Sequence, residues 1–285
     1  AHPVPDEASL AGGAAIQDAI AKCGKDAHLL FLVSGGASSL AEVLPAGITL
    51  KDLTLETEIL LASGKDIHAM NARRKEVSQI KGGKALEGFM GSRVTAFAIS
   101  DVQGDDVGVI GSGIAAAPNT FDFEYTSFIV ASNKIARQAA ADHAGTSAIN
   151  NLEDMYDDVT VLATKIVAQL RASEDGIHIM GGEPTVVLPS NPGLGGRNMM
   201  LAAMIARELK GTTGIRVLVA GTDGTDGPTD AAGALVDGQT WDESGHLAIE
   251  QANVAPWLDA KDVLIRSGPT GTNVMDLLIA EVRSS

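Results

Sequence analysis

Short apolar runs recur along the chain, separated by amphipathic stretches, and this alternation limits the fold more than any other feature of the sequence. Most runs are apolar at consecutive positions, which is typical of strands buried on both faces of a sheet. The stretches between them repeat their apolar residues every three or four positions, as amphipathic helices do. The pattern predicts an α/β fold with a mostly parallel sheet. The expected strands cover residues 28–33, 94–100, 127–131, 177–180, 215–220 and 262–266, and the expected helices cover residues 7–22, 52–63, 66–76, 132–143, 152–171 and 198–210.

The length of the chain, 285 residues, favours two domains over one. The polar, alanine-rich stretch from Ser132 to Ser147 lies between two groups of predicted strands and helices. We therefore expect a division near residue 130. An N-terminal domain would cover residues 1–130 and a C-terminal domain residues 131–285.

The net charge of −15 opposes binding to nucleic acid or to anionic lipid, both of which require clustered lysine and arginine. The basic side chains that do cluster are therefore of interest. They form either a local anion site or the solvated face of a helix, and the composition alone does not decide between these. The cluster contains Arg73, Arg74, Lys75, Lys81 and Lys84.

The location expected from the sequence is the cytoplasm. The first ten residues lack the basic start and apolar core of a secretory signal, and no apolar run is long enough to span a bilayer. The single cysteine, Cys23, has no partner for a disulfide or a metal site and is expected to be a structural core residue.

Glycine-rich loops follow several of the predicted strands. Because ligands of open α/β sheets bind at the carboxyl ends of strands, these loops predict one shared site. The loop at 34–39, with sequence SGGASS, precedes a predicted helical segment at 40–44. Its backbone amides, serine hydroxyls and helix start favour phosphate binding, and the alternative is a serine-capped turn.

A second helix start, at 191–210, carries an arginine in a glycine-rich context. Gly193, Gly195 and Gly196 leave space around Arg197, and Asn198 is a candidate cap of the helix. An arginine at such a position suits a carboxylate or a transferring phosphoryl group. The alternative is an ordinary surface arginine.

Two acidic loops complete the pattern. Asp223 and Asp226 follow the strand at 215–220, with Asp230 more simply explained as a turn residue, and a second group lies at 101–106. Such carboxylates can hold Mg²⁺ with water or accept a proton from a hydroxyl group. Acidic loops beside anion-binding loops are the arrangement that magnesium-nucleotide chemistry requires.

Several familiar enzyme classes are excluded by missing motifs. The chain contains no P-loop, no G-x-G-x-x-G fingerprint, no G-x-S-x-G elbow and no H-E-x-x-H zinc motif. A P-loop kinase and a simple Rossmann dehydrogenase are therefore not expected.

Eight motifs in order give the sequence a family resemblance that covers essentially the whole chain. It resembles the glycerate 2-kinase family, whose C-terminal half is the MOFRL domain and whose members are often labelled hydroxypyruvate reductase. The motifs are HPVPDE (2–7), SGGASSL (34–40), NARRKEVSQIKGGK (71–84), SDVQGDD (100–106), GGEPTV (181–186), GLGGRN (193–198), GTDGTDGPTDAAG (221–233) and SGPTGTNVMDL (267–277).

The resemblance implies a Rossmann-like domain and a smaller α/β MOFRL domain with the active site in the cleft between them. It implies transfer of the γ-phosphoryl group of ATP, with Mg²⁺, to the 2-hydroxyl of D-glycerate, giving 2-phosphoglycerate. Reduction of hydroxypyruvate with a nicotinamide cofactor is the first alternative and non-catalytic binding of a sugar acid or nucleotide is the second. Assembly into a homo-oligomer is left open.

The resemblance also implies roles for individual residues. Arg197 would be the catalytic arginine and Asp223 the metal ligand or general base. The nucleotide phosphates would contact Ser34, Gly35, Gly36, Ser38, Asn71, Arg74, Ser78 and Lys81. The substrate or metal would contact Asp101, Glu183, Asn198, Asp226, Thr270, Thr272 and Asn273.

The sequence departs from the family pattern at several places. The family has a glycine-lysine-alanine motif, with a lysine implicated in catalysis, before the point where this sequence begins. We expect the first domain to lack that segment and apolar surface of its sheet to be exposed as a result. Smaller departures are Met199, Glu76 and the tripeptide at 112–114, where the family has glutamine, histidine and serine-glycine-proline.

Overall fold

The computed structural model of the chain describes residues 5–55 and 75–284. The chain divides into two compact units, Ala1–Ala131 and Ser132–Ser285. Both units combine helices with a β-sheet, so the predicted α/β class is confirmed. Within this chain the second unit has more residues than the first, whereas the family resemblance implied a smaller C-terminal domain.

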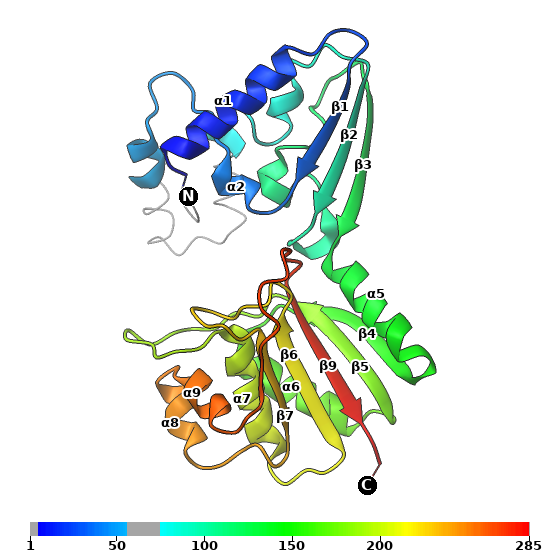
Figure 1. Cartoon of the computed structure of the whole chain (residues 1–285), viewed down its shortest axis with the longest axis vertical. Helices are drawn as coiled ribbons and strands as arrows, with labels where there is room; N and C mark the ends of the chain where they lie inside the picture. Colours follow the sequence, from blue (N-terminus) through cyan, green and yellow to red (C-terminus); the bar gives the residue numbers. More distant parts are fainter. Residues whose placement is uncertain (1–4, 56–74, 285) are drawn as a thin grey trace. The chain divides into compact units, whose positions relative to one another are not determined.

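The first unit contains a parallel three-stranded sheet in the order β1-β2-β3, as the apolar runs predicted. Helix α1 begins at a capping box in which Asp6 accepts a hydrogen bond from the backbone amide of Ser9. Figure 1 shows α1 and α2 on the same face of this sheet. The elements are α1 (Glu7–Ala21), β1 (His28–Val33), α2 (Ala37–Leu40), η1 (Lys84–Leu86), β2 (Arg93–Ile99), η2 (Gln103–Asp105), η3 (Ile110–Gly113) and β3 (Glu124–Ala131).

The two faces of this sheet are covered unequally. Alternate residues of β2, such as Val94 and Ala96, are fully buried in the core of the unit. On the opposite face Leu32 is 76% exposed, and Phe128 of β3 is 49% exposed and stacks on Phe97. Apolar side chains therefore lie exposed on this face of the sheet.

The second unit contains a six-stranded mixed sheet in the order β4-β5-β9-β6-β7-β8. Its last strand, β9, lies in the middle of the sheet and is antiparallel to both β5 and β6. The elements are α5 (Asn133–Ala144), η4 (Gly145–Ser147), β4 (Ala148–Met155), α6 (Val159–Arg171), β5 (Gly176–Gly182), α7 (Arg197–Leu209), β6 (Ile215–Gly221), β7 (Gly233–Asp237), α8 (Gly245–Glu250), α9 (Val254–Asp259), β8 (Leu264–Ile265) and β9 (Asp276–Val282).

Helix α7 is the most buried helix that the structure describes, because nearly all of its residues between Asn198 and Leu209 are buried. It packs with α6 on one face of the sheet, where Met180 of β5 joins the same core. The next residue of β5, Gly181, faces Asn133 and Arg137 of α5. Because neighbouring strand residues point to opposite faces, α5 covers the other face of this sheet (Figure 1).

One predicted helix begins too early. We expected a helix over 152–171, but residues Ala148–Met155 form β4 and helix α6 begins at Val159. The side chain of Asp158 accepts the amide of Thr160 and caps the helix, which explains the late start. The helices expected at 52–63 and 66–76 lie largely outside the described residues.

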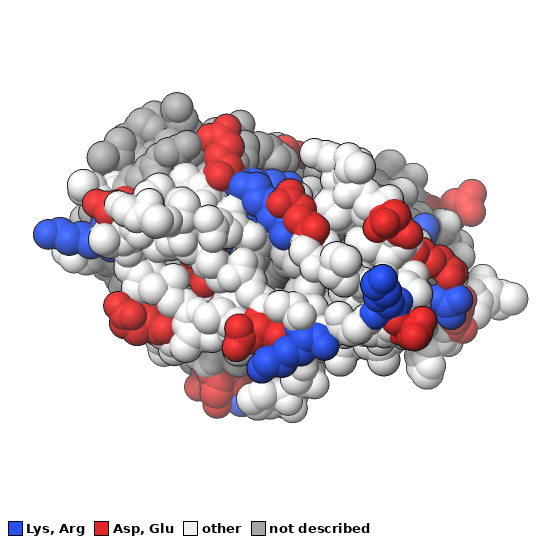
Figure 2. Space-filling view, turned by 90° about the horizontal axis from the view of Figure 1, so that it is seen from above, with Lys and Arg blue, Asp and Glu red and all other residues white. Residues whose placement is uncertain are grey.

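Charged side chains on the view in Figure 2 are mixed in sign, with lysine and arginine beside aspartate and glutamate. Within residues 5–55 and 75–284 we find no helix with the length and hydrophobicity that a bilayer-spanning segment requires.

Candidate active site

Three strand ends meet at one edge of the second sheet. Because β9 runs antiparallel to its neighbours, its first residue, Asp276, pairs with Gly182 at the end of β5 and Gly221 at the end of β6. The loops after β5 and β6 and the loop before β9 therefore converge. A pocket of about 510 Å³ lies there, beside the start of α7.

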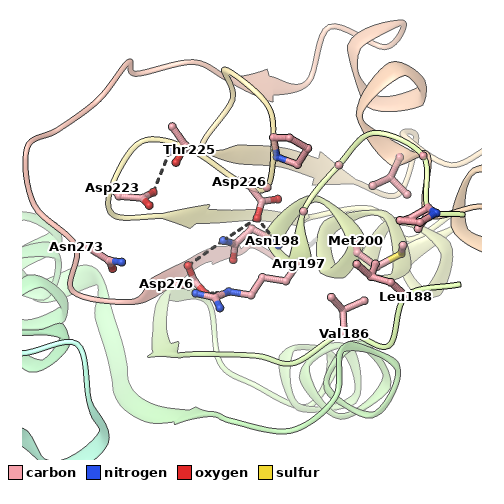
Figure 3. A pocket seen from close by; sticks show the side chains of 18 residues that line it. Val186, Leu188, Arg197, Asn198, Met200, Asp223, Thr225, Asp226, Asn273 and Asp276 are labelled. Carbon is pink, nitrogen blue, oxygen red and sulfur yellow. Dashed lines mark hydrogen bonds and ion pairs between the residues drawn. The ribbon is translucent and has the colours of Figure 1, made fainter. Parts of the chain in front are cut away.

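The pocket has a polar wall and an apolar wall (Figure 3). The polar wall comes from the loops at the strand ends and from the first turn of α7, and the apolar wall includes Val186, Leu188 and Met200. The polar side chains are Arg197, Asn198, Asp223, Thr225, Asp226, Asn273 and Asp276. The loop before α7 and the loop after β6 therefore both line this pocket.

Arg197, the first residue of α7, forms two ion pairs. Its Nε donates to Oδ2 of Asp276 at 2.7 Å and its Nη1 donates to Oε1 of Glu183 at 2.8 Å. Burial by itself lowers the pKa of Arg197, but the two carboxylates outweigh this effect and raise it, so the guanidinium remains charged. The site therefore holds a permanent cation at the pocket wall.

Asp226 caps helix α7 from a neighbouring loop. Its two carboxylate oxygens accept the backbone amides of Asn198 at 3.1 Å and Met199 at 2.7 Å. A side chain at Gly196, the residue before the helix, would place Cβ 2.3 Å from Oδ1 of Asp226, so glycine leaves room for this carboxylate. The amides that would otherwise attract a ligand's anion are therefore already occupied.

Burial raises the pKa of Asp226 to about 6, against the two amide hydrogen bonds, which lower it. Burial likewise raises the pKa of Asp276, while the positive charge of Arg197 opposes the rise. The two carboxylates are 4% and 2% exposed, respectively. A proton at this site is therefore held more tightly than on a solvated aspartate.

Asn198 lies between these two carboxylates. Its Nδ2 donates to Oδ1 of Asp276 at 2.9 Å and lies 3.4 Å from Oδ1 of Asp226. Since carboxylates only accept hydrogen bonds, this environment fixes the amide orientation. Its Oδ1 is buried and has no hydrogen-bond partner among the described residues, so an acceptor remains unused in the pocket wall.

Asp223 is half-buried at the opposite part of the polar wall (Figure 3). Its Oδ1 accepts the amide of Thr225 at 2.9 Å, and its backbone carbonyl accepts the amide of Thr270 at 3.1 Å. These bonds hold the aspartate in the pocket, and no hydrogen bond to its second carboxylate oxygen is found among the described residues.

The loop before β9 is held mainly by its own polar groups. The hydroxyl of Thr270 donates to the carbonyl of Thr222 at 2.6 Å, and Oδ1 of Asn273 accepts the amide of Met275 at 2.9 Å. The hydroxyl of Thr272 is buried without a partner among the described residues. Of the predicted contacts in this loop, Asn273 is the one that lines the pocket.

Asp230 lies outside this site, as its interpretation as a turn residue suggested. Its side chain is 78% exposed and pairs with Arg266. Within the described part of the chain, no group of three or more histidine, cysteine, aspartate or glutamate side chains is arranged to hold a metal ion. A magnesium ion bound here would take most of its ligands from phosphate and water oxygens.

The helix at the serine-glycine loop of the first unit is shorter than we expected. Helix α2 covers only Ala37–Leu40, so the prediction of a helix continuing through 40–44 is wrong. The loop contains Ser34, Gly35 and Gly36, and the carboxylate of Asp101 packs directly against Gly35. This loop therefore offers amides and hydroxyls but no long helix start.

Two residues predicted to contact phosphate are buried. Lys81 is fully buried and its Nζ lies 2.6 Å from both Oε2 of Glu42 and the carbonyl of Ser38. Ser78 is 1% exposed and accepts the amide of Lys81. Lys81 therefore supports the serine-glycine loop from inside, whereas the Ser78 hydroxyl binds the backbone of its own segment. The predicted contacts Asn71 and Arg74 lie outside the described residues.

Sequence reasoning missed Asp276 and the side chains that hold it. Asn133 donates to the backbone carbonyl of Asp276 at 2.9 Å, and Arg137 donates to Oδ1 of Asn133 and to Glu153. The signal was present, since Asp276 is a lone acidic residue at the start of the apolar run DLLIAEV. It was overlooked because that run was not recognised as a strand.

Comparisons with known proteins agree with this description. Residues 1–145 match a domain of unknown function, DUF4147, and residues 176–276 match the MOFRL family. D-glycerate 2-kinase of Thermotoga maritima is 32% identical over 98% of this chain and 78% of its own, and glycerate 2-kinase of Pyrococcus horikoshii is 32% identical over 99% and 77%. A putative hydroxypyruvate reductase of Agrobacterium vitis is also 32% identical, over 97% of this chain and 85% of its own.

Solved structures give the same result. The crystal structure of glycerate kinase from Thermotoga maritima matches with a TM-score of 0.89 at 30% identity, over 99% of this chain and 80% of that one. A crystal structure from Pyrococcus horikoshii matches with a TM-score of 0.81 at 29% identity, over 100% and 78%. The chain belongs to the glycerate 2-kinase family, with its second unit carrying the MOFRL region.

Proposed function

We propose that this protein is a glycerate 2-kinase, which transfers the γ-phosphoryl group of ATP to the 2-hydroxyl of D-glycerate and releases 2-phosphoglycerate. The observation that carries the proposal is a charged Arg197 in the same pocket as the carboxylate of Asp223. The guanidinium suits the anionic phosphoryl group that is transferred, and the carboxylate suits the hydroxyl that receives it. Phosphoryl transfer needs this combination of positioning and charge stabilisation.

In this proposal Arg197 stabilises the negative charge that develops on the transferring phosphoryl group. Asp223 orients the 2-hydroxyl and accepts its proton, or holds the metal ion through water. The amide groups of Asn198 and Asn273 lie in the same wall and supply partners for the hydroxyls of the acid. Asp226 acts as support for the helix that carries Arg197.

Mg²⁺ fits the oxygen-rich polar wall, and its chemistry would be to neutralise phosphate charge during transfer. The residues of this chain that would hold it are Asp223, with Asn273 beside it. We further propose that the amides and hydroxyls at Ser34, Gly35, Gly36 and Ser38, with Asn71 and Arg74, bind the nucleotide phosphates.

The proposal is tested first by the reaction itself. Purified protein is mixed with D-glycerate and MgATP, and separately with hydroxypyruvate and NADH. Release of ADP in the first mixture supports the kinase, and loss of NADH absorbance in the second would support the reductase instead. The absence of a dinucleotide fingerprint favours the first outcome.

The role of Arg197 is tested by Arg197→Ala. We expect kcat to fall about a hundredfold or more, since a contact made mainly in the transition state is lost. Arg216→Ala is a matched control, because Arg216 lies on β6 but does not line this pocket. A change confined to KM would make Arg197 a substrate-holding residue and contradict the catalytic role.

A further inference from the structure

The two carboxylates paired with Arg197 differ sharply in their surroundings. The side chain of Asp276 is 3% exposed, whereas that of Glu183 is 48% exposed. Asp276 also accepts a hydrogen bond from Asn198, and its backbone is fixed between β5 and β6. For Glu183 no second side-chain hydrogen bond is found among the described residues.

The carboxylates around Arg197 already outnumber its single positive charge. One guanidinium faces two carboxylates, and it leaves Nη2 without a hydrogen-bond partner among the described residues. An incoming carboxylate or phosphate would be a third anion at this position. It can bind well only if one of the two carboxylates leaves, and the half-exposed ion pair costs less to break than the buried one.

The loop around Glu183 permits such a departure without a change of the backbone. Two residues further on, the backbone carbonyl of Thr185 accepts a hydrogen bond from the amide of Val159 at 2.9 Å. The amide of Thr185 donates to the carbonyl of Asp157 at 3.2 Å. The side chain of Glu183 can therefore rotate away while the loop stays in place. Asp276 has no comparable freedom.

From these contacts we infer that Glu183 is a displaceable internal anion that occupies the ligand position on Arg197, and that Asp276 is the positioning residue that keeps the guanidinium aimed at the pocket. The ligand class is a small carboxylate or phosphate. The inference rests on the proposed function, which supplies the transferring phosphoryl group as that ligand, and it differs from the prediction that Glu183 itself contacts substrate or metal.

The first experiment measures equilibrium binding without turnover. D-glycerate and, separately, inorganic phosphate are titrated by calorimetry into the full chain and into Glu183→Gln. We expect the variant to bind at least one of them about two- to fivefold more tightly, the change that loss of a half-exposed competing ion pair would give. Unchanged or weaker binding overturns the inference, since a carboxylate that contacts substrate or metal would weaken binding when neutralised.

The second experiment tests whether Asp276 acts through Arg197. Asp276→Asn should lower kcat more than tenfold with a smaller change in KM, and it should have little further effect when added to Arg197→Ala. Additive effects of the two substitutions would show that Asp276 acts elsewhere and overturn its positioning role. Asp230→Asn, on the exposed part of the acidic loop between β6 and β7, is the control for removing a carboxylate.

The two experiments separate this inference from the proposed function. If wild-type protein phosphorylates D-glycerate but Glu183→Gln does not bind an anion more tightly, only the inference fails. If wild-type protein neither binds D-glycerate nor releases ADP with it, the proposed function fails. Glu183 is half-exposed, so its variant should fold even if Asp276→Asn does not.

Discussion

Replacing Asp226 by asparagine should change how the stability of the second unit depends on pH. Burial raises the pKa of Asp226 from 3.8 to about 6 in the folded protein, and its two amide hydrogen bonds only partly oppose this. The raised pKa favours the protonated carboxyl in the folded state. The contribution of Asp226 to the unfolding free energy is therefore greatest below about pH 4 and is lost as the pH rises through about 6. The asparagine variant has no such titration.

The size of the effect follows from the pKa difference. A rise from 3.8 to about 6 corresponds to about 3 kcal/mol of unfolding free energy, of which about 2 kcal/mol is lost between pH 4.5 and pH 7. Asparagine keeps one amide hydrogen bond and loses the other, at a cost of about 1 kcal/mol that does not vary with pH. Relative to wild type, Asp226→Asn should therefore gain about 2 kcal/mol between pH 4.5 and pH 7.

Tryptophan fluorescence isolates the unit concerned, because both tryptophans of the chain, Trp241 and Trp257, are buried in the core of the second unit. For a unit of this size the gain corresponds to a relative shift in Tm of roughly 4–8 °C between the two pH values. Asp230→Asn serves as the exposed control. A difference between Asp226→Asn and wild type that stays constant with pH would refute the buried, proton-holding role of Asp226.

Three further substitutions probe the support of the two units. Lys81→Met should destabilise the first unit by about 3–5 kcal/mol, measured by calorimetry, because it leaves the buried carboxylate of Glu42 unpaired. A Tm within about 1 °C of wild type, as expected of a neutral change, would contradict this. Gly196→Ala should cost about 1–3 kcal/mol and lower kcat, since its Cβ meets the carboxylate of Asp226, and both effects are read from fluorescence melting and ADP release. Leu32→Ser should change unfolding free energy by less than about 0.5 kcal/mol, because that side chain is 76% exposed; a larger loss would mean that the exposed face is covered in solution.

The predictable parts of the fold are the elements whose secondary structure is determined by one short segment of sequence. The run at 28–33 is apolar after its first residue, and β1 covers His28–Val33 as expected. Strand β4 was not predicted, because its sequence AINNLEDM mixes apolar and polar residues and its polar side chains bind partners far away along the chain. Asn150, for example, bonds His178 on β5, and Asn151 accepts from Arg137 on α5. A window of local sequence does not contain those partners.

Local sequence likewise decided which residues of the candidate site could be predicted. Glycine, arginine and aspartate in loops after apolar runs were enough to identify Arg197, Asp223 and Asp226 as neighbours in one pocket. The partner that orients Arg197 is 79 residues away along the chain, at the start of β9. Its position depends on the final strand entering the middle of the sheet with an antiparallel direction. No local pattern encodes that choice, so Asp276 was missed.

The central position of β9 also has a functional consequence. A strand at the edge of a sheet has one neighbour, whereas β9 is hydrogen-bonded on both sides and is held at its first residue by Asn133 from α5. Asp276 is therefore among the most rigidly placed carboxylates that the structure describes, while Glu183 sits on a loop in partial contact with solvent. The guanidinium of Arg197 can therefore bind an anion on the side of Glu183 while Asp276 keeps its orientation. That asymmetry is why the two carboxylates should respond oppositely to neutralisation, one in kcat and the other in binding.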